Sequence, residues 1–311
     1  MHRQQQQFIN LFALLLLGAF FSNLYLSWWE IVAILLFTLL FDLSISSCGG
    51  GVPTREMPFS SLATAIGVIL MMVSTHFYIY FVVIALALLQ KHCLKIEIFQ
   101  NVSTSATLLP HNEPRKLTPR HFFNPSNFAI IMALLFFYKD AHIVLGQLGD
   151  APWLALLLTL MAVAILIRVN RWIIPLSFIF FYLIFEYLWV VRLDPVLIME
   201  EVYYRFYSIS FILFILFMLT DPKTTPSKNI HQLLFSLGVA MLSVGLDYLH
   251  GYRVQHLFLS LFFFSLFTPL VEGWGVRSRS VLFITFMVAT LATGAIITIE
   301  SKPPFYFTMD D

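Results

Sequence analysis

The chain carries very little charge for its length. Only 11% of its 311 residues are Asp, Glu, Lys or Arg, whereas about a quarter of a typical soluble domain is charged. Apolar residues make up 59% of the chain, and Phe alone accounts for 33 positions. A soluble core of this size does not need so much apolar surface, so the composition indicates a polytopic membrane protein.

Cysteine and recognisable catalytic motifs are also scarce. The two cysteines are too few for a disulfide framework or a Cys-ligated cluster. The nine histidines form no metal-binding pattern, so we expect no metal. A net charge of +1 decides nothing about nucleic acid, but no basic patch with interleaved aromatics is present, so we expect no nucleic acid partner. Catalytic residues remain unknown because no Walker motif or nucleophile–base arrangement is found.

Apolar segments of membrane-spanning length follow one another along the chain. A transmembrane helix needs about 20 apolar residues, and eleven segments approach that length: 8–25, 29–45, 60–74, 76–90, 126–145, 152–168, 172–190, 205–220, 231–250, 255–273 and 280–299. The third and fourth are short and could form half-helices, which leaves ten spans as an alternative. We predict an all-α polytopic integral membrane protein with 10–11 transmembrane helices and a single membrane domain, 1–311.

The distribution of positive charge predicts the orientation. If the N-terminus is cytoplasmic and the spans alternate, thirteen of the 18 Lys and Arg residues fall in cytoplasmic segments, as the positive-inside rule requires. The only long hydrophilic segment, about 91–125, then forms a cytoplasmic loop. No other loop is long enough to fold alone, so a soluble catalytic domain would have to belong to a partner.

A weak internal repeat divides the chain. The segment 60–64 begins an apolar stretch that leads to Asn124-Pro125, and 150–155 begins another that leads to Asp221-Pro222. We therefore predict repeat 1 over about 1–145, repeat 2 over about 146–275, and an extra C-terminal helix over about 280–299. In transporter-like folds built from such repeats, the ligand site lies between them.

The first polar motif, within 121–127, contains Asn124, Pro125 and Asn127. Proline suits the first turn of a helix, and Asn124 would be its N-cap. One interpretation is a capped helix start at the membrane surface. The other is a ligand site, in which the free N–H groups at the positive end of the helix face an anion or a ring carbonyl.

The second motif, 217–226, follows an apolar helix and contains Thr220, Asp221, Lys223 and Thr224. Because the residue before a proline is disfavoured in a helix, the helix should end at Asp221. This segment could be a helix stop with a surface ion pair between Asp221 and Lys223. It could also bind a ligand, with Asp221 accepting from a heterocycle N–H and with Lys223 and the threonines near a phosphate.

Ionisable residues inside predicted spans are candidates for an ion pathway. Asp42 and Glu272 end their segments and could be interfacial, whereas Glu186 and Asp247 lie deeper. We therefore assign Glu186 and Asp247 to a candidate ion or proton pathway. The alternative is that they only form hydrogen bonds to neighbouring helices.

Six segments resemble, in order and at similar spacing, motifs of one membrane protein family. They are 60–64 (Ser-Ser-Leu-Ala-Thr), 123–125 (Phe-Asn-Pro), 146–155 (Gly-Gln-Leu-Gly-Asp-Ala-Pro-Trp-Leu-Ala), 172–175 (Trp-Ile-Ile-Pro), 217–222 (Phe-Met-Leu-Thr-Asp-Pro) and 268–272 (Thr-Pro-Leu-Val-Glu). The family includes the D subunit of Rnf-type electron transport complexes (RnfD) and the B subunit of the sodium-pumping NADH:quinone oxidoreductase (NqrB). The chain resembles a divergent member, similar to a branch found with enediyne biosynthesis.

The resemblance implies a flavoprotein subunit for electron transport in a bacterial-type inner membrane, with two five-helix repeats, ion coupling and further membrane or peripheral redox subunits as partners. Classical members attach FMN to a Thr in a Ser-Gly-Ala-Thr motif, which the corresponding interval 128–144 lacks. We therefore expect FMN or riboflavin to be bound non-covalently, by Asn124, Asn127, Thr220, Asp221, Lys223 and Thr224. The missing Thr favours an alternative, a transporter or channel for a small solute, such as a flavin or a pathway product, without redox activity.

Overall fold

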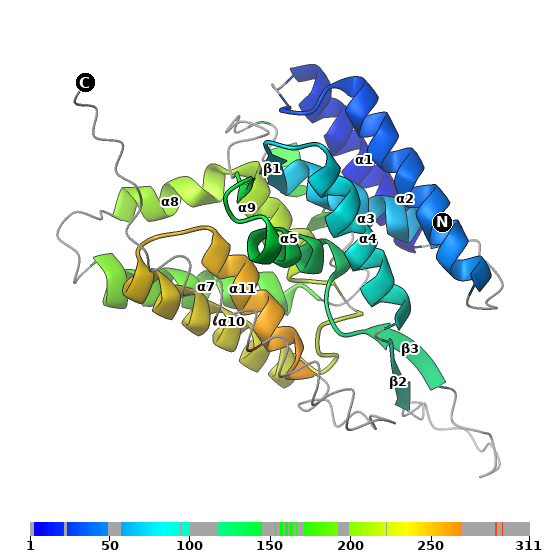
Figure 1. Cartoon of the computed structure of the whole chain (residues 1–311). Helices are drawn as coiled ribbons and strands as arrows, with labels where there is room; N and C mark the ends of the chain where they lie inside the picture. Colours follow the sequence, from blue (N-terminus) through cyan, green and yellow to red (C-terminus); the bar gives the residue numbers. More distant parts are fainter. Residues whose placement is uncertain are drawn as a thin grey trace, which may run out of the picture.

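Helices form most of the protein, and strands are few and short (Figure 1). The computed structural model describes residues 3–21, 24–48, 57–93, 95–99, 117–144, 171–191, 199–221 and 223–268, with scattered positions between 153 and 166 and at 290 and 294. The predicted helix 280–299 and most of the predicted loop 91–125 lie outside the described residues, as does much of the predicted helix 152–168. The prediction of an all-α protein is confirmed.

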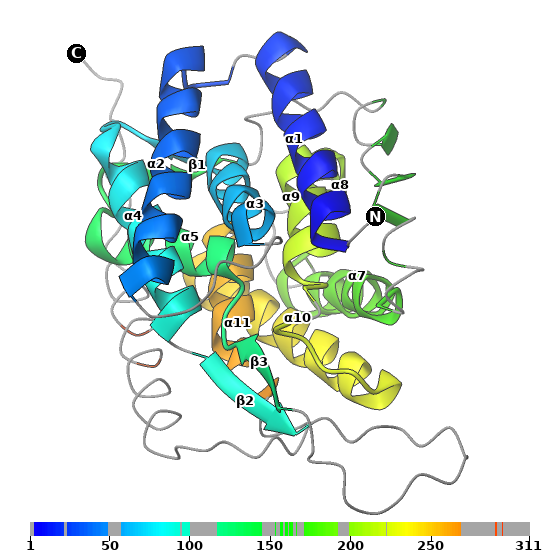
Figure 2. The ribbon, with the colours of Figure 1, turned by 90° about the vertical axis from the view of Figure 1, so that its right-hand side faces the viewer.

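The first half of the chain forms a group of five helices. They are α1 (Arg3–Phe21), α2 (Trp28–Cys48), α3 (Met57–Met71), α4 (Tyr78–Cys93) and α5 (Pro125–Phe136). Helix α3 packs against both α1 and α2, and α4 packs against α2 and α5 (Figure 2).

The second half contains helices that are more often interrupted. They are α7 (Ile173–Phe185), which continues into the π-helix η1 (Glu186–Val191), α8 (Met199–Tyr207), α9 (Ile209–Leu213), which continues into the π-helix η2 (Phe214–Met218), α10 (Asn229–His250) and α11 (Gln255–Ser265). Helix α10 packs along α7 and α11, and α11 contacts α5. The contact between α5 and α11 joins the two halves.

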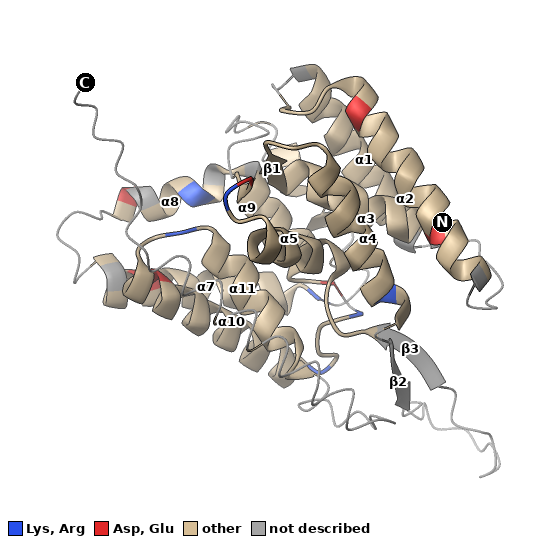
Figure 3. Cartoon of the chain, in the orientation of Figure 1, with Lys and Arg blue, Asp and Glu red and all other residues tan. Residues whose placement is uncertain are grey.

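Two of the described helices, α2 and α10, are long and apolar enough to cross a membrane; the other apolar helices are shorter. One side of α2 exposes Val32, Leu36, Leu40 and Leu43, each more than half accessible. An apolar stripe of this kind marks contact with lipid or another protein. Figure 3 shows that Lys, Arg, Asp and Glu are sparse on the helices.

Short helices followed by short strands replace two of the predicted spans. Helices α3 and α5 have 15 and 12 residues, about 22 and 18 Å at 1.5 Å per residue, less than the roughly 30 Å hydrocarbon core. Strand β1 (Met72–Ser74) follows α3 and pairs antiparallel with β4 (Ala141–Ile143), which follows α5. The pairing satisfies backbone groups where the helices stop, as non-helical backbone inside a membrane protein requires. A second antiparallel pair, β2 (Lys95–Phe99) with β3 (Leu117–His121), lies within the predicted loop.

The segment predicted as one helix over 205–220 is instead broken. Ser208 has extended backbone angles (φ −71°, ψ 125°) and separates α8 from α9, and η2 then follows α9 with the wider turn of a π-helix. The apolar pattern continues through Ser208, so the break has no signal in hydropathy. Its consequence is that α8 and α9 are separate helices, and α8 carries Arg205 into the protein interior.

Glycine at position 238 permits close packing of α10 on α11. A Cβ atom there would lie 2.2 Å from the ring of Phe264, whereas a Cβ at Gly245 of the same helix would meet no atom within 4 Å. Gly238→Ala should therefore destabilise the protein by about 1–3 kcal/mol through overpacking. Gly245→Ala is the matched control and should be neutral or stabilising, because Ala is the better helix former. Thermal unfolding in detergent measures both, and equal melting temperatures would contradict the packing argument.

Candidate functional site

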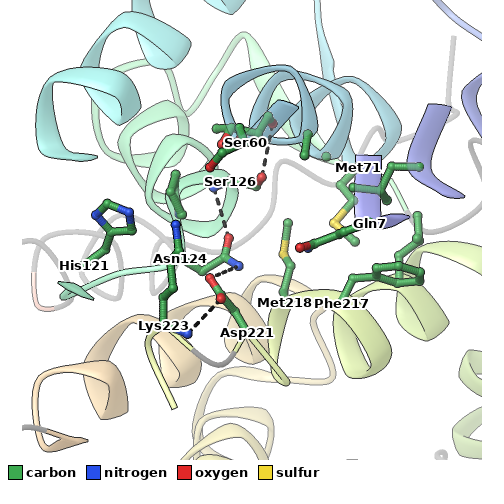
Figure 4. Close-up of a pocket in the computed structure, with 16 residues that line it drawn as sticks. Gln7, Ser60, Met71, His121, Asn124, Ser126, Phe217, Met218, Asp221 and Lys223 are labelled. Atoms are coloured by element: carbon green, nitrogen blue, oxygen red, sulfur yellow. Dashed lines mark hydrogen bonds between the residues drawn. The ribbon is translucent and has the colours of Figure 1, made fainter. Parts of the chain in front are cut away.

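The two polar motifs meet in space, although they lie 97 positions apart in the sequence. Nδ2 of Asn124 donates a hydrogen bond of 3.3 Å to Oδ2 of Asp221 (Figure 4). Asn124 precedes α5 in the first half of the chain, and Asp221 follows η2 in the second half. The bond therefore joins the halves at one polar point.

Asn124 is held in place as the N-cap of α5. Its backbone is extended (φ −61°, ψ 123°), and its Oδ1 accepts from the backbone N–H groups of Ser126 at 3.0 Å and Asn127 at 3.2 Å. Pro125 occupies the first turn, where its missing N–H has no cost. The predicted cap is confirmed, and it leaves the amide nitrogen of Asn124 directed at Asp221.

A tight turn after η2 fixes Asp221. Its Oδ1 accepts from the backbone N–H of Lys223 at 3.0 Å. Its carbonyl oxygen accepts from the backbone N–H groups of Thr224 at 3.1 Å and Thr225 at 3.0 Å, and from both threonine hydroxyls. Each carboxylate oxygen thus has a donor, one from its own turn and one from Asn124.

A cavity of about 260 Å³ lies against this junction (Figure 4). Its volume is just below the roughly 300–1,000 Å³ of typical small-molecule sites. Gln7 of α1, Ser60 of α3 and Asn124 at the start of α5 line it, together with Asp221 and Lys223. Three of these side chains lie near helix N-termini, where the helix dipole is positive and favours electron-rich ligand groups.

Apolar side chains from both halves of the chain also line the cavity. Leu11 and Met71 line it from the first half, and Leu213, Phe217 and Met218 line it from the second. Small-molecule sites commonly combine such apolar surface with polar groups that orient the ligand.

Close contact between α3 and α5 shapes the floor of the cavity. A Cβ at Gly67 would lie 2.7 Å from Oγ of Ser126, and this Oγ donates to the carbonyl of Thr64 at 3.1 Å. Small residues allow helices in membranes to approach in this way. The hydroxyl of Ser126 is therefore committed to the helix contact.

The structure separates the six predicted binding residues into two groups. Asn124, Asp221 and Lys223 line the cavity, whereas the other three do not. Thr220 donates to the carbonyl of Leu216 at 2.6 Å, and Thr224 donates within the Asp221 turn.

Asn127 makes a contact between the two halves instead. Its Nδ2 donates to the carbonyl of Phe258 in α11 at 3.2 Å, and no described residue partners its buried Oδ1. The side chain is fully buried, so it tethers α5 to α11 behind the cavity.

Sequence reasoning missed the contribution of α3. Ser60, Thr64, Gly67 and Met71 all line the cavity, at intervals of four, three and four residues. This spacing places them on one face of a helix. A stripe of small and polar residues at helical spacing could therefore have predicted that α3 lines the cavity.

The second candidate pair, Glu186 and Asp247, lies in a different buried cluster. Nδ1 of His256 lies 2.6 Å from Oδ1 of Asp247, and Nη1 of Arg205 lies 3.3 Å from Oδ2. Arg205, at the start of the predicted span 205–220, lies in α8 and is 5% exposed. Its partners were hidden from the sequence because α8, α10 and α11 meet only after folding.

Aromatic groups complete the surroundings of Arg205. Its Nη1 donates to the phenol oxygen of Tyr182 at 2.5 Å, and its guanidinium carbon lies 3.2 Å from the ring centroid of Tyr252, a cation–π contact. Burial raises the pKa of the Tyr252 phenol, and the nearby Arg205 opposes that effect. Among the described residues, no group of three or more His, Cys, Asp or Glu could hold a metal ion.

The apolar helices, the broken backbone and the internal polar cavity define an all-α membrane protein with a cavity between its two halves. The chain belongs to the NQR2, RnfD, RnfE family, whose model matches residues 13–281. This family is membrane-integral, and its members are subunits of multi-subunit complexes for electron transport and ion translocation. No curated protein matches the chain.

Exchanging the two residue types of the Asn124–Asp221 pair should reveal how much their hydrogen bond contributes to the stability of the protein. Asn124→Asp keeps a capping oxygen but places a second carboxylate against Asp221, so we expect a loss of about 1–3 kcal/mol. Asn124→Ser also caps and adds no charge, and it should lose less. Adding Asp221→Asn to Asn124→Asp restores a donor and an acceptor and should recover most of the loss in thermal unfolding. Additive losses in the double variant would contradict direct contact.

Removal of Arg205 should lower the stability of the protein, because the buried negative charge of Asp247 then loses its positively charged partner. We expect Arg205→Met to destabilise the protein by about 3–5 kcal/mol, the usual result of breaking a buried ion pair. Arg253→Met is the control, since only the backbone N–H of Arg253 donates to Asp247, at 2.9 Å. Denaturation in detergent should leave this control near the wild type. Similar losses in both variants would contradict the assigned pair.

Proposed function

We propose that the protein is a membrane-embedded, flavin-binding subunit for electron transport, coupled to ion translocation. The observation that carries the proposal is the Asn124–Asp221 hydrogen bond, which brings two family-like motifs to one wall of the cavity. Family membership supports the electron-transport setting.

The residues that line the cavity suit the ring system of FMN or riboflavin. Asp221 is an acceptor for a ring N–H, and Lys223 and Gln7 carry donors for ring carbonyls. Phe217 and Met218 offer apolar surface to the hydrophobic edge of the ring. A bound flavin supplies one- and two-electron relay, while these residues bind it, orient it and keep water from the buried side.

Non-covalent binding fits this chain better than covalent attachment. The interval 128–144 contains no Thr and therefore no acceptor for a flavin phosphoester at the family position. Asn127, Thr220 and Thr224, which we also expected to bind the cofactor, do not line the cavity. The backbone N–H of Asn127 fixes Asn124 and the hydroxyl of Thr224 fixes Asp221.

The membrane setting implies further partners. We assign the chain to a bacterial-type inner membrane with a cytoplasmic N-terminus, on the basis of the positive charge in alternate segments. The donor and acceptor of electrons then belong to other membrane or peripheral redox subunits, because apart from the segment 91–125 no predicted loop is long enough to fold alone.

Absorbance and fluorescence spectra of the detergent-purified protein, before and after acid denaturation, test the proposal. We expect denaturation to release flavin, and Asp221→Ala to lower its occupancy at least tenfold through loss of the ring N–H acceptor. Asp42→Ala is the control, since Asp42 pairs with His92 on α4, away from the cavity.

Three results would argue against this assignment. Flavin that stays on the polypeptide would overturn non-covalent binding. Flavin retained equally by Asp221→Ala would overturn the site. A protein with neither flavin nor flavin affinity would overturn the redox function and favour the small-solute transporter, which a flux assay in proteoliposomes measures.

A further inference from the structure

Glu186 is a buried carboxyl group with few hydrogen-bond donors. Its side chain is 0% exposed, and among the described residues neither carboxyl oxygen has a partner at full hydrogen-bond distance and geometry, although Tyr182 and Asp247 lie close to it. It is the first residue of η1, where the α-helix α7 changes to a π-helix. Short π-helical segments occur frequently at functional sites.

Glu186 faces ionisable groups from each element around it. Four groups act on it electrostatically: Tyr182 of α7, Arg205 of α8, Asp247 of α10 and Tyr252 of the turn after α10. A fifth, His256 of α11, contacts Asp247. None of these residues belongs to the cavity beside Asn124. The cluster is therefore a separate site.

Asp247 has more hydrogen-bond donors around its carboxyl group than Glu186 has. Its Oδ1 accepts from the backbone N–H of Arg253 at 2.9 Å and lies 2.6 Å from Nδ1 of His256, while its Oδ2 accepts from Arg205. Hydrogen bonds to a carboxylate favour its charged form. Arg205 makes its ion pair with Asp247 and not with Glu186, so its positive charge compensates Asp247 more directly than Glu186.

We propose that Glu186 is a proton-binding site whose carboxyl group takes up and releases one proton. Isolated buried carboxylates are so costly that the group takes up a proton instead. The reaction is uptake of H⁺ by the carboxylate to give the neutral acid, and its release reverses that step. Two neighbouring carboxyl groups disfavour each other's ionisation, and Glu186 has fewer hydrogen-bond donors than Asp247, so the exchangeable proton is placed on Glu186.

The site does not depend on flavin binding, and purified protein without an electron donor is sufficient to examine it. Infrared difference spectra between neutral and alkaline pH report protonated carboxyl groups directly. We expect a carboxylic acid C=O band at neutral pH that shifts in D₂O and disappears at alkaline pH. Glu186→Gln should lose this band and still fold, because the amide has the shape of the neutral acid.

The control variant is Asp42→Asn. Asp42 is also a buried acid, but Nε2 of His92 lies 2.8 Å from its Oδ1, so its removal should leave the band unchanged. Thermal unfolding confirms that each variant is folded before its spectrum is taken.

Four outcomes would overturn the proposal. The wild type could lack a protonated carboxyl band, or the band could persist in Glu186→Gln. A band unchanged by D₂O and by pH would identify a carboxylic acid that does not exchange its proton. A band that disappears when sodium replaces potassium at constant pH would identify a metal cation site instead.

Discussion

The hydrogen bond between Asn124 and Asp221 is the constraint on which the site depends. It forms because Asn124 is the N-cap of α5 and Asp221 lies three residues after the end of η2, where each side chain is fixed by its own turn. The N-cap interaction orients one partner and the carbonyl–threonine turn orients the other. The cavity wall is thus specified by local backbone structure in two distant segments.

Incomplete helices make room for this arrangement. Helix α3 ends at Met71 and α5 ends at Phe136, and the chain continues from each into a short strand. The ladder between β1 and β4 provides the hydrogen bonds that the helices no longer supply, so the backbone can turn without exposing polar groups to hydrocarbon. The short α3 also brings Gly67 against Ser126, which forms the floor of the cavity.

Sequence patterns predicted the features that depend on local chemistry. Uninterrupted apolar runs gave α2 and α10 to within a few residues, and Asn124-Pro125 marked the start of α5. The only sequence indication that Asn124 and Asp221 pair was that each precedes a proline at the equivalent position of the two predicted repeats. The break at Ser208, the π-helical turns and the burial of Arg205 had no local signal, because tertiary contacts with α10 and α11 decide them.

The Arg205–Asp247 pair also constrains how the chain enters a membrane. At the centre of a membrane helix, each charge alone costs roughly 2.5–3.5 kcal/mol to insert. The two residues lie 42 positions apart, on α8 and α10. Until the pair forms, each charge adds to the cost of placing its helix in lipid. The second half of the protein should integrate as a cooperative unit, with α8 retained next to the insertion machinery until α10 emerges.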